Sequence, residues 1–248
     1  MKRKTASLFV LVLAAAILFS GCSSGGNLSD TQKWFNTSYA VLTYANKGDL
    51  NQIGGFKRTD TTKELIRQML DSSWDVTDRA SADETLDYLL TEGHRSDFAA
   101  DVAYLKEIGA MDYSIDEAVA AFANEDPESE ALVRTVLEAN GALGEHAIDA
   151  WDYCRAMQLL GNYYIAGYYT LEESMDKSLE VAKTLQGMYT SWDEMMDSYL
   201  YGYRYWQEDD IDDPDSASAA RLQVYEELKS SGKNPYTLDW NLPLEKTW

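Results

Sequence analysis

The fold is decided by residues 146–168, which read HAIDAWDYCRAMQLLGNYYIAGY. Small and apolar residues recur in this stretch at alternating steps of three and four, which places them on one face of a helix. They are Ala147, Ala150, Cys154, Met157, Gly161, Tyr164 and Tyr168. Nearly opposite lie Ile148, Asp152, Arg155 and Leu159. A helix that can pack on both sides is expected to be central and buried, and Gly161 would let a neighbouring segment approach closely.

One charged pair lies on this central helix. Asp152 and Arg155 are three residues apart and are therefore neighbours on the helix surface. Ile148 and Leu159 flank them on the same side. The sequence thus predicts a partly buried ion pair, because a lone charge in that position would be costly.

The remainder of the chain also has the pattern of helices. Six positions show the capping-box spacing, in which a Ser or Thr and a Glu or Gln three residues later satisfy each other's free backbone donors. They are Ser29/Gln32, Thr61/Glu64, Ser81/Glu84, Ser114/Glu117, Thr170/Glu173 and Ser191/Glu194. Further starts are predicted at Asp126-Pro127 and Asp213-Pro214, and helix ends at Gly93, Gly109, Gly141 and Gly232.

Strand patterns are missing from the sequence, since no segment alternates with period two for long enough. The sequence therefore predicts an all-α protein, with a single compact multi-helix domain over residues 29–248. Residues 235–244 are apolar and contain two Pro, so they cannot form the interior of a helix. We expect them to pack as an extended tail across the helices, with Tyr236, Trp240 and Leu242 as anchors.

The helix that begins at Ser191 has two different faces. One carries large side chains that we expect in the core: Trp192, Met195, Met196, Tyr199, Tyr203 and Trp206. The other carries a strip of acids and tyrosines: Glu194, Asp197, Tyr201 and Tyr205. Such a strip could bind a sugar, a cation or the basic side chain of a partner. Peripheral packing under the C-terminal tail is the alternative, and we favour it.

The amino terminus has the pattern of an export signal. Three basic residues at positions 2–4 precede an apolar run over residues 8–19, which is shorter than the ~20 residues of a membrane-spanning helix. Ser20 and Gly21 then precede Cys22, and this resembles the lipobox of bacterial lipoproteins, whose cysteine is lipidated; Phe19 departs from the usual Leu. We expect a signal peptide over residues 1–21 and a lipidated cysteine with a flexible tether over residues 22–28. An ordinary secretory signal is the alternative.

Charge and composition limit the class of function. The chain has 42 acidic and 21 basic residues and a net charge of −21, and removal of the signal peptide makes it −24. Nucleic-acid binding is therefore not expected. Because anionic headgroups would repel this surface, the lipid must hold the protein at the extracytoplasmic side of a membrane in the bacterial cell envelope. With two His and two Cys and no phosphate-cradling or metal-binding motif, we expect neither a cofactor nor a metal.

Four polar residues are the candidates for catalysis: His94, Arg95, Asp152 and Arg155. His94 could act as a general acid or base, oriented by Asp152 or Asp75. In the structural interpretation, which we favour, His94 and Arg95 bond the last carbonyls of the preceding helix or pair with Asp152. No motif nominates a nucleophile.

Three further features have a functional and a structural interpretation. Four tryptophans could line a ligand pocket but are more typical of a core: Trp74, Trp151, Trp192 and Trp206. Cys154 could be a catalytic thiol, but its place on the apolar face predicts a buried and inert side chain. The acidic segment 208–215 could bind Ca²⁺, but it lacks the order of an EF-hand loop and we expect a solvated loop.

Several short motifs occur together in one order. They are Ser73-Trp74, Leu89-Leu-Thr-Glu-Gly-His94-Arg95, Trp151-Asp-Tyr-Cys-Arg155, Gly167-Tyr168, Ser191-Trp192, Tyr199-Leu-Tyr-Gly202 and Asn234-Pro-Tyr-Thr-Leu-Asp-Trp240. The set resembles the bacterial domain-of-unknown-function family 1266, over about residues 61–244. Asp239 departs from the Pro expected before Trp240, and Asn162-Tyr163 departs from the usual aromatic-Gly pair. The resemblance implies an all-helical domain and brings no activity with it.

The sequence thus leaves two functions open. The first, which we favour, is a lipid-anchored helical domain that binds a protein or peptide without catalysis. The second is a hydrolase or transferase that uses the polar centre of His94, Arg95, Asp152 and Arg155.

Overall fold

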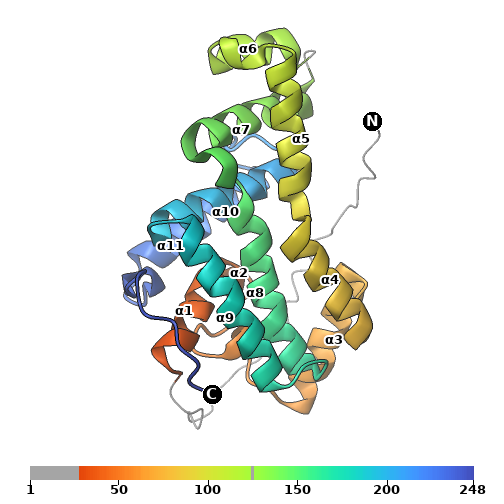
Figure 1. Cartoon of the computed structure of the whole chain (residues 1–248), viewed down its shortest axis with the longest axis vertical. Coiled ribbons are helices and arrows are strands. Elements are labelled where there is room, and N and C mark those ends of the chain that lie inside the picture. The colour runs from red at the N-terminus through yellow and green to blue at the C-terminus, as the bar shows by residue number, and fades with distance from the viewer. Residues whose placement is uncertain (1–27, 124–125) are drawn as a thin grey trace.

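Every regular element in the computed structural model is helical over the residues that it describes, 28–123 and 126–248 (Figure 1). The predicted all-α class is confirmed. At the centre lies α8, Asp149–Ala166, which is slightly shorter at both ends than the predicted helix. Both of its predicted faces are buried, with Cys154 and Met157 on one side and Asp152 and Leu159 on the other. The prediction of a central, buried helix is also confirmed.

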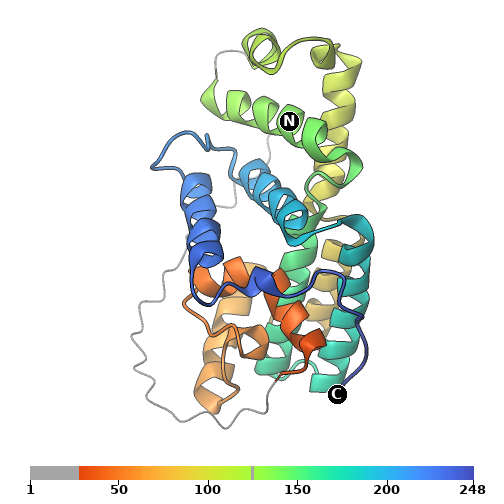
Figure 2. The same cartoon turned by 90° about the vertical axis from the view of Figure 1, so that its left-hand side faces the viewer.

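The other elements pack around or above α8 (Figures 1 and 2). Before α8 come α1 (Asp30–Ser38), α2 (Ala40–Ala45), η1 (Ile53–Gly55), α3 (Asp60–Trp74), α4 (Arg79–Thr91), α5 (Gly93–Glu107), η2 (Ala110–Asp112), α6 (Ile115–Phe122), α7 (Pro127–Leu143) and η3 (Gly144–His146). After it come α9 (Leu171–Met188), α10 (Trp192–Gln207), α11 (Ala217–Ser230) and η4 (Pro235–Thr237).

Most of the predicted helix starts are correct. Ser29, Ser114 and Thr170 each form the complete reciprocal capping box. Asp126 caps α7, with Pro127 at the first helical position. Ser191 caps α10, although the Glu194 carboxylate accepts its bonds from Thr190 rather than from Ser191.

Three predicted starts and one predicted end are wrong: Thr61/Glu64, Ser81/Glu84, Asp213-Pro214 and Gly141. Helix α3 begins two residues early, because the Thr59 hydroxyl already accepts the N–H of Thr62. Asp78 caps α4 in the same way. The Asp213 carboxylate instead accepts the N–H of Asp215 in a turn, and Ser216 caps α11. Gly141 lies inside α7, which ends at Leu143.

Buried side chains form two clusters, which divide the molecule along its long axis. We call residues 93–143 the upper lobe, comprising α5, α6 and α7, and the remaining described residues the lower body (Figure 1). The core of the lower body contains a group of indoles in tilted and edge-to-face contact, with ring centroids of Trp34 and Trp192 4.8 Å apart and those of Trp192 and Trp240 also 4.8 Å apart. The core of the upper lobe consists mainly of Ala, Val and Leu, with Phe98 at its base.

The carboxyl-terminal tail packs across the lower body, as predicted. The Trp240 indole is buried, and its N–H donates to the Tyr189 carbonyl at 3.2 Å. The Trp240 carbonyl accepts from Trp34 Nε1 at 3.1 Å. Leu242 is only partly buried, whereas Leu244, which we did not predict as an anchor, is 7% exposed. The tail therefore docks on α1 and α9 through both backbone bonds and apolar side chains.

Gly161 allows the close approach that the sequence predicts. A Cβ at this position would lie 2.6 Å from the Cα of Gly54 in η1, which is too close for any real side chain. Gly54 itself has a φ of 69°, in the left-handed region. Two glycines thus let the loop before α3 lie directly on α8.

The predicted signal peptide and lipidated Cys22 lie outside the described residues. In the part of the chain that the structure describes, no helix is both long and apolar enough to span a membrane. Lipidation therefore stays a prediction.

Candidate functional site

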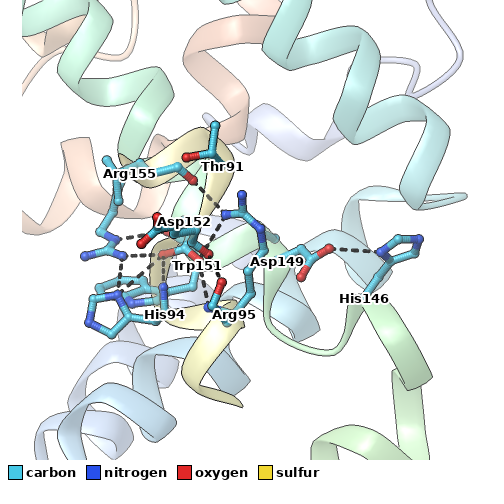
Figure 3. A network of polar contacts seen from close by, with 12 residues as sticks. Thr91, His94, Arg95, His146, Asp149, Trp151, Asp152 and Arg155 are labelled. Carbon is cyan, nitrogen blue, oxygen red and sulfur yellow. Dashed lines mark hydrogen bonds and ion pairs between the residues drawn. The ribbon is translucent and has the colours of Figure 1, made fainter. Parts of the chain in front are cut away.

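The structure brings the four predicted polar residues together where the upper lobe meets the lower body. Figure 3 shows Asp152 at the centre, with His94, Arg95 and Arg155 turned toward it. Asp152 and Arg155 come from α8, and the other two come from the first turn of α5. The Asp152 side chain is fully buried, whereas that of His94 is 23% exposed. The predicted ion pair is present, with 2.5 Å between Arg155 Nη2 and Asp152 Oδ1.

The Asp152 carboxylate caps helix α5. The residue before α5, Glu92, contributes no side-chain bond to its free N–H groups. Asp152 supplies this bond from another helix, because its Oδ1 accepts the N–H of His94 and its Oδ2 the N–H of Arg95, each at 3.1 Å. The negative carboxylate also complements the positive end of the helix dipole. Asp152 therefore joins α5 to α8.

The position before His94 is restricted to glycine. Gly93 has a φ of 59°, and a Cβ there would lie 2.2 Å from Asp152 Oδ2. A side chain would therefore collide with the carboxylate and strain the backbone. Gly93 turns the chain sharply from α4 into α5 and leaves room for the cap.

The two arginines hold the buried carboxylate from both sides. Arg95 Nη1 lies 3.3 Å from Asp152 Oδ2 and also donates to the Leu89 carbonyl of α4 at 2.6 Å. This bond is the one that the structural interpretation predicts for Arg95. The Arg155 guanidinium lies 4.2 Å from the centroid of the Trp151 ring, and its Nε donates to the Trp151 carbonyl at 3.2 Å.

The environment keeps Asp152 charged. Burial would raise the pKa of its carboxyl, but the Arg155 charge and the backbone N–H groups of His94 and Arg95 outweigh burial and hold the pKa below its usual value. Burial lowers the pKa of the Arg155 guanidinium, and Asp152 opposes that change. The pair is therefore a charged, hydrogen-bonded joint.

The His94 ring faces an arginine rather than an orienting carboxylate. Its Nδ1 lies 2.9 Å from Arg155 Nη2 and 3.5 Å from Asp152 Oδ1. Because a guanidinium only donates, Nδ1 must accept this bond, which leaves the ring proton on Nε2. In a catalytic His–Asp pair the carboxylate would accept a hydrogen bond from a ring N–H. The other predicted partner, Asp75, ends α3 in a left-handed conformation.

Comparison with known proteins places this geometry in a family. A model described as "Protein of unknown function (DUF1266)" matches residues 69–240. The chain belongs to this family. The DUF1266 region contains all four residues of the polar centre, whereas α1, α2 and Leu244 lie outside it.

A curated relative of the chain is also uncharacterised. The chain is 27% identical over 181 residues to the "Uncharacterized protein YbeU" of Escherichia coli (strain K12), a match that covers 69% of this chain and 75% of the relative. No solved structure matches the chain. The comparisons therefore establish the family and leave the activity open.

One residue of the predicted strip on α10, Tyr205, is buried and does not share a surface with the others. Tyr205 is 2% exposed, since its ring packs against Phe98 at 5.3 Å between centroids and its hydroxyl donates to Asp101 Oδ2 at 2.6 Å. Helix α5 covers this side of α10, which the spacing within α10 could not reveal. Asp197 remains exposed, and Tyr201 and Glu194 are partly buried.

The other candidates take structural positions. Trp151 and Trp192 are buried, and Trp74 and Trp206 pack against the same core. Cys154 is fully buried, and burial raises the pKa of its thiol. Among the described residues, no three His, Cys, Asp or Glu form a group that could hold a metal ion, the acidic segment 208–215 included.

Sequence reasoning missed a hollow at the opposite end of α8 from the polar centre. It measures about 620 Å³, and its lining includes Arg58, Arg79 and Tyr164. The available signal was residues 57–67, KRTDTTKELIR, in which basic residues outnumber acidic ones in an otherwise acidic chain.

Proposed function

We propose that the chain is an extracytoplasmic helical module of the bacterial cell envelope, held at a membrane by lipid on Cys22, that binds a protein or peptide without catalysing a reaction. The observation that supports a non-catalytic role is that Asp152 is buried and fully engaged in structural contacts. Its two oxygens accept the N–H groups of α5 and lie against two arginines, and its side chain has no exposed surface.

Catalysis by this centre would need a group that can reach a substrate and exchange a proton with it. The Asp152 side chain has no exposed surface, and His94 Nδ1 already accepts a hydrogen bond from Arg155. What remains for an enzyme is the Nε2–H of one partly exposed imidazole. The geometry therefore favours a framework role for all four residues.

The upper lobe offers a surface that suits a protein partner. Tyr104 is 60% exposed and Tyr113 is 54% exposed, and both belong to this lobe. Large exposed tyrosines are typical of residues that contribute strongly to binding energy. Exposed carboxylates accompany them on α5, η2 and α6: Asp97, Glu107, Asp112, Asp116 and Glu117. The complementary partner is a basic protein or peptide.

Site-specific photo-crosslinking in cells tests this proposal. A crosslinking amino acid replaces Tyr104 in one chain and Tyr113 in another, and Lys183, which is exposed on α9 of the lower body, in a control. We expect a reproducible crosslinked neighbour from the two upper-lobe positions and none from position 183. Absence of a neighbour at both upper-lobe positions would contradict a binding surface there.

The lipid anchor is tested separately. Metabolic labelling with a fatty acid should mark the natural chain and not Cys22→Ser, which should also leave the membrane fraction. Equal labelling of both chains would exclude Cys22 as the lipidated residue.

The enzyme alternative is tested with His94→Ala and Asp152→Asn. We expect His94→Ala to keep the fold and the crosslink, and Asp152→Asn to lose stability. A variant that folds normally but loses a measurable turnover would instead indicate a catalytic site.

A further inference from the structure

A hollow at the lower end of α8 gathers positive charge in an acidic protein. It lies where the turn from α8 to α9 meets the starts of α3 and α4, and Arg58, Arg79, Tyr164, Tyr168 and Glu173 contribute to its lining (Figure 1). A second hollow shares Arg58 and adds Thr59, Asp60 and Lys63. Over residues 57–67 there are four basic and two acidic residues, in a chain whose net charge is −21.

Two of these cations are unpaired. Within the described residues, neither Arg58 nor Lys63 forms an ion pair with a carboxylate, whereas Arg79 pairs with Glu173 at 2.9 Å and with Asp83 at 3.2 Å. The arginines of the polar centre, by contrast, both contact Asp152.

The two unpaired cations converge on one point above the backbone. A Cβ on Gly167 would lie 3.5 Å from Arg58 Nη2 and 3.6 Å from Lys63 Nζ. Gly167 has a φ of 80° at the end of α8, so this position favours glycine for its conformation as well. Both positively charged groups therefore approach the same position at the carboxyl end of α8.

Aromatic rings orient the guanidinium groups around the hollow. The Arg58 guanidinium lies 5.0 Å from the Tyr164 ring centroid, and that of Arg79 lies 4.5 Å from the Tyr169 centroid. A guanidinium stacked on a ring keeps its N–H groups in its own plane, where they can bind an anion with two parallel hydrogen bonds.

We propose that this hollow binds a phosphate group, which Arg58 contacts through its planar N–H groups and Lys63 through its ammonium. A phosphate matches the two cations in charge and offers several acceptor oxygens. The phosphate could belong to a lipid headgroup or to a soluble phosphate ester.

The position of the hollow makes a lipid headgroup a suitable source. The start of α1 lies at the same lower end of the molecule (Figures 1 and 2). Asp30 follows Cys22 by eight residues, so only a short segment separates the proposed lipid from α1. The headgroup source therefore rests on the proposed lipid anchor, whereas the phosphate site itself does not.

The test compares thermal unfolding of the full chain in micelles of a neutral detergent. One arm adds inorganic phosphate, against sodium chloride at equal ionic strength. The other dopes the micelles with phosphatidylglycerol, against diacylglycerol, which lacks the phosphate. The test variant is Arg58→Gln with Lys63→Gln. The matched control is Lys183→Gln with Lys233→Gln, which makes the same change in net charge at exposed positions elsewhere.

We expect inorganic phosphate or phosphatidylglycerol to stabilise the natural chain and the control. The affinity of the test variant for the same ligand should fall at least about tenfold. Stabilisation by inorganic phosphate indicates a soluble ester, and stabilisation by phosphatidylglycerol alone indicates a headgroup. An equal shift in all three chains, or no shift in the natural chain, would overturn the proposal. Because neither arm involves a protein partner, this result is independent of the crosslinking experiment.

Discussion

The upper lobe and the lower body have different kinds of core. The lower body buries Trp34, Trp151, Trp192 and Trp240 in one core, which the carboxyl-terminal tail closes. The upper lobe contains no tryptophan, and its core is built mainly from small aliphatic residues. Since buried apolar area is the main source of stability, the lower body is the more stable of the two regions.

Polar contacts with the lower body add to the apolar packing of the upper lobe on Ile148 and Tyr205. Asp152 caps its first helix, Tyr205 bonds Asp101, and Arg204 pairs with Glu138 at 2.9 Å. Charged residues that would otherwise be available for chemistry thus fix one region on the other. The polar centre of this fold therefore connects the upper lobe to the lower body.

Deletion of residues 234–248 should have the largest effect. It removes two buried side chains, Trp240 and Leu244, each worth about 1.5–3 kcal/mol, so we expect a loss of about 3–6 kcal/mol and a lower melting temperature. Hydrogen exchange should show that the upper lobe loses protection together with the lower body. An unchanged melting temperature would disprove the docking, and an upper lobe that stays protected would show that it folds independently.

Asp152→Ala should cost about 3–5 kcal/mol, because it leaves Arg155 buried without its partner and uncaps α5. Hydrogen exchange should show the first loss of protection in the upper lobe. A loss that is equal in both regions would contradict the joint.

The pH dependence of unfolding adds a control on the same residue. The folded-state pKa of Asp152 is lowered, so its contribution is complete above the unfolded pKa of about 3.9 and is lost as the pH falls through the lower, folded value. Between these values, Asp152→Asn should show a weaker dependence of stability on pH than the natural chain. Identical slopes would mean that folding does not lower the pKa of Asp152.

Gly93→Ala should cost about 1–3 kcal/mol through its left-handed backbone, and the contact with Asp152 should add to this. The matched control is Gly141→Ala in α7, where a Cβ meets nothing within 4 Å. This control should stabilise the protein by about 0.5–1 kcal/mol. Equal effects of the two substitutions on the melting temperature would refute the steric argument at Gly93.

Tyr205→Phe should have the smallest effect, about 0.5–1.5 kcal/mol, because it removes one hydroxyl and keeps the ring against Phe98. Tyr104→Phe is the control, since that side chain is 60% exposed and its change should be close to zero. Chemical denaturation measures both. A Tyr205 variant as stable as the control would mean that this hydroxyl does not help to hold the upper lobe.

Local patterns in the sequence predicted much of the fold. Ser29, Ser114 and Thr170 cap their helices as their spacing indicates, and Gly161 makes the expected close contact. Asp213-Pro214 failed because a nearby residue, Ser216, provides an equally good cap, and single-sequence patterns do not rank the two. Helix content was thus more predictable than helix ends.

The site depends on contacts between distant parts of the chain. The pairing of Asp152 with Arg155 follows from a step of three residues, but the N–H groups that Asp152 caps lie 57 and 58 residues earlier. Tyr205 is buried by a helix about one hundred residues away, whereas the sequence favoured packing under the C-terminal tail, because the periodicity of α10 alone does not show which element covers it. Such contacts are decided by tertiary packing, which a single sequence does not display.

The contact between the tail and α1 has a consequence for the order of folding. Trp34 is buried against Trp240, and the Thr247 hydroxyl meets that of Ser29 at 2.7 Å, across 218 residues. During synthesis, the indole of Trp34 therefore cannot reach all of its final neighbours until nearly the whole chain has been made. Contacts of such long sequence separation slow folding. A nascent chain halted before residue 240 would expose an aromatic surface for chaperones to recognise.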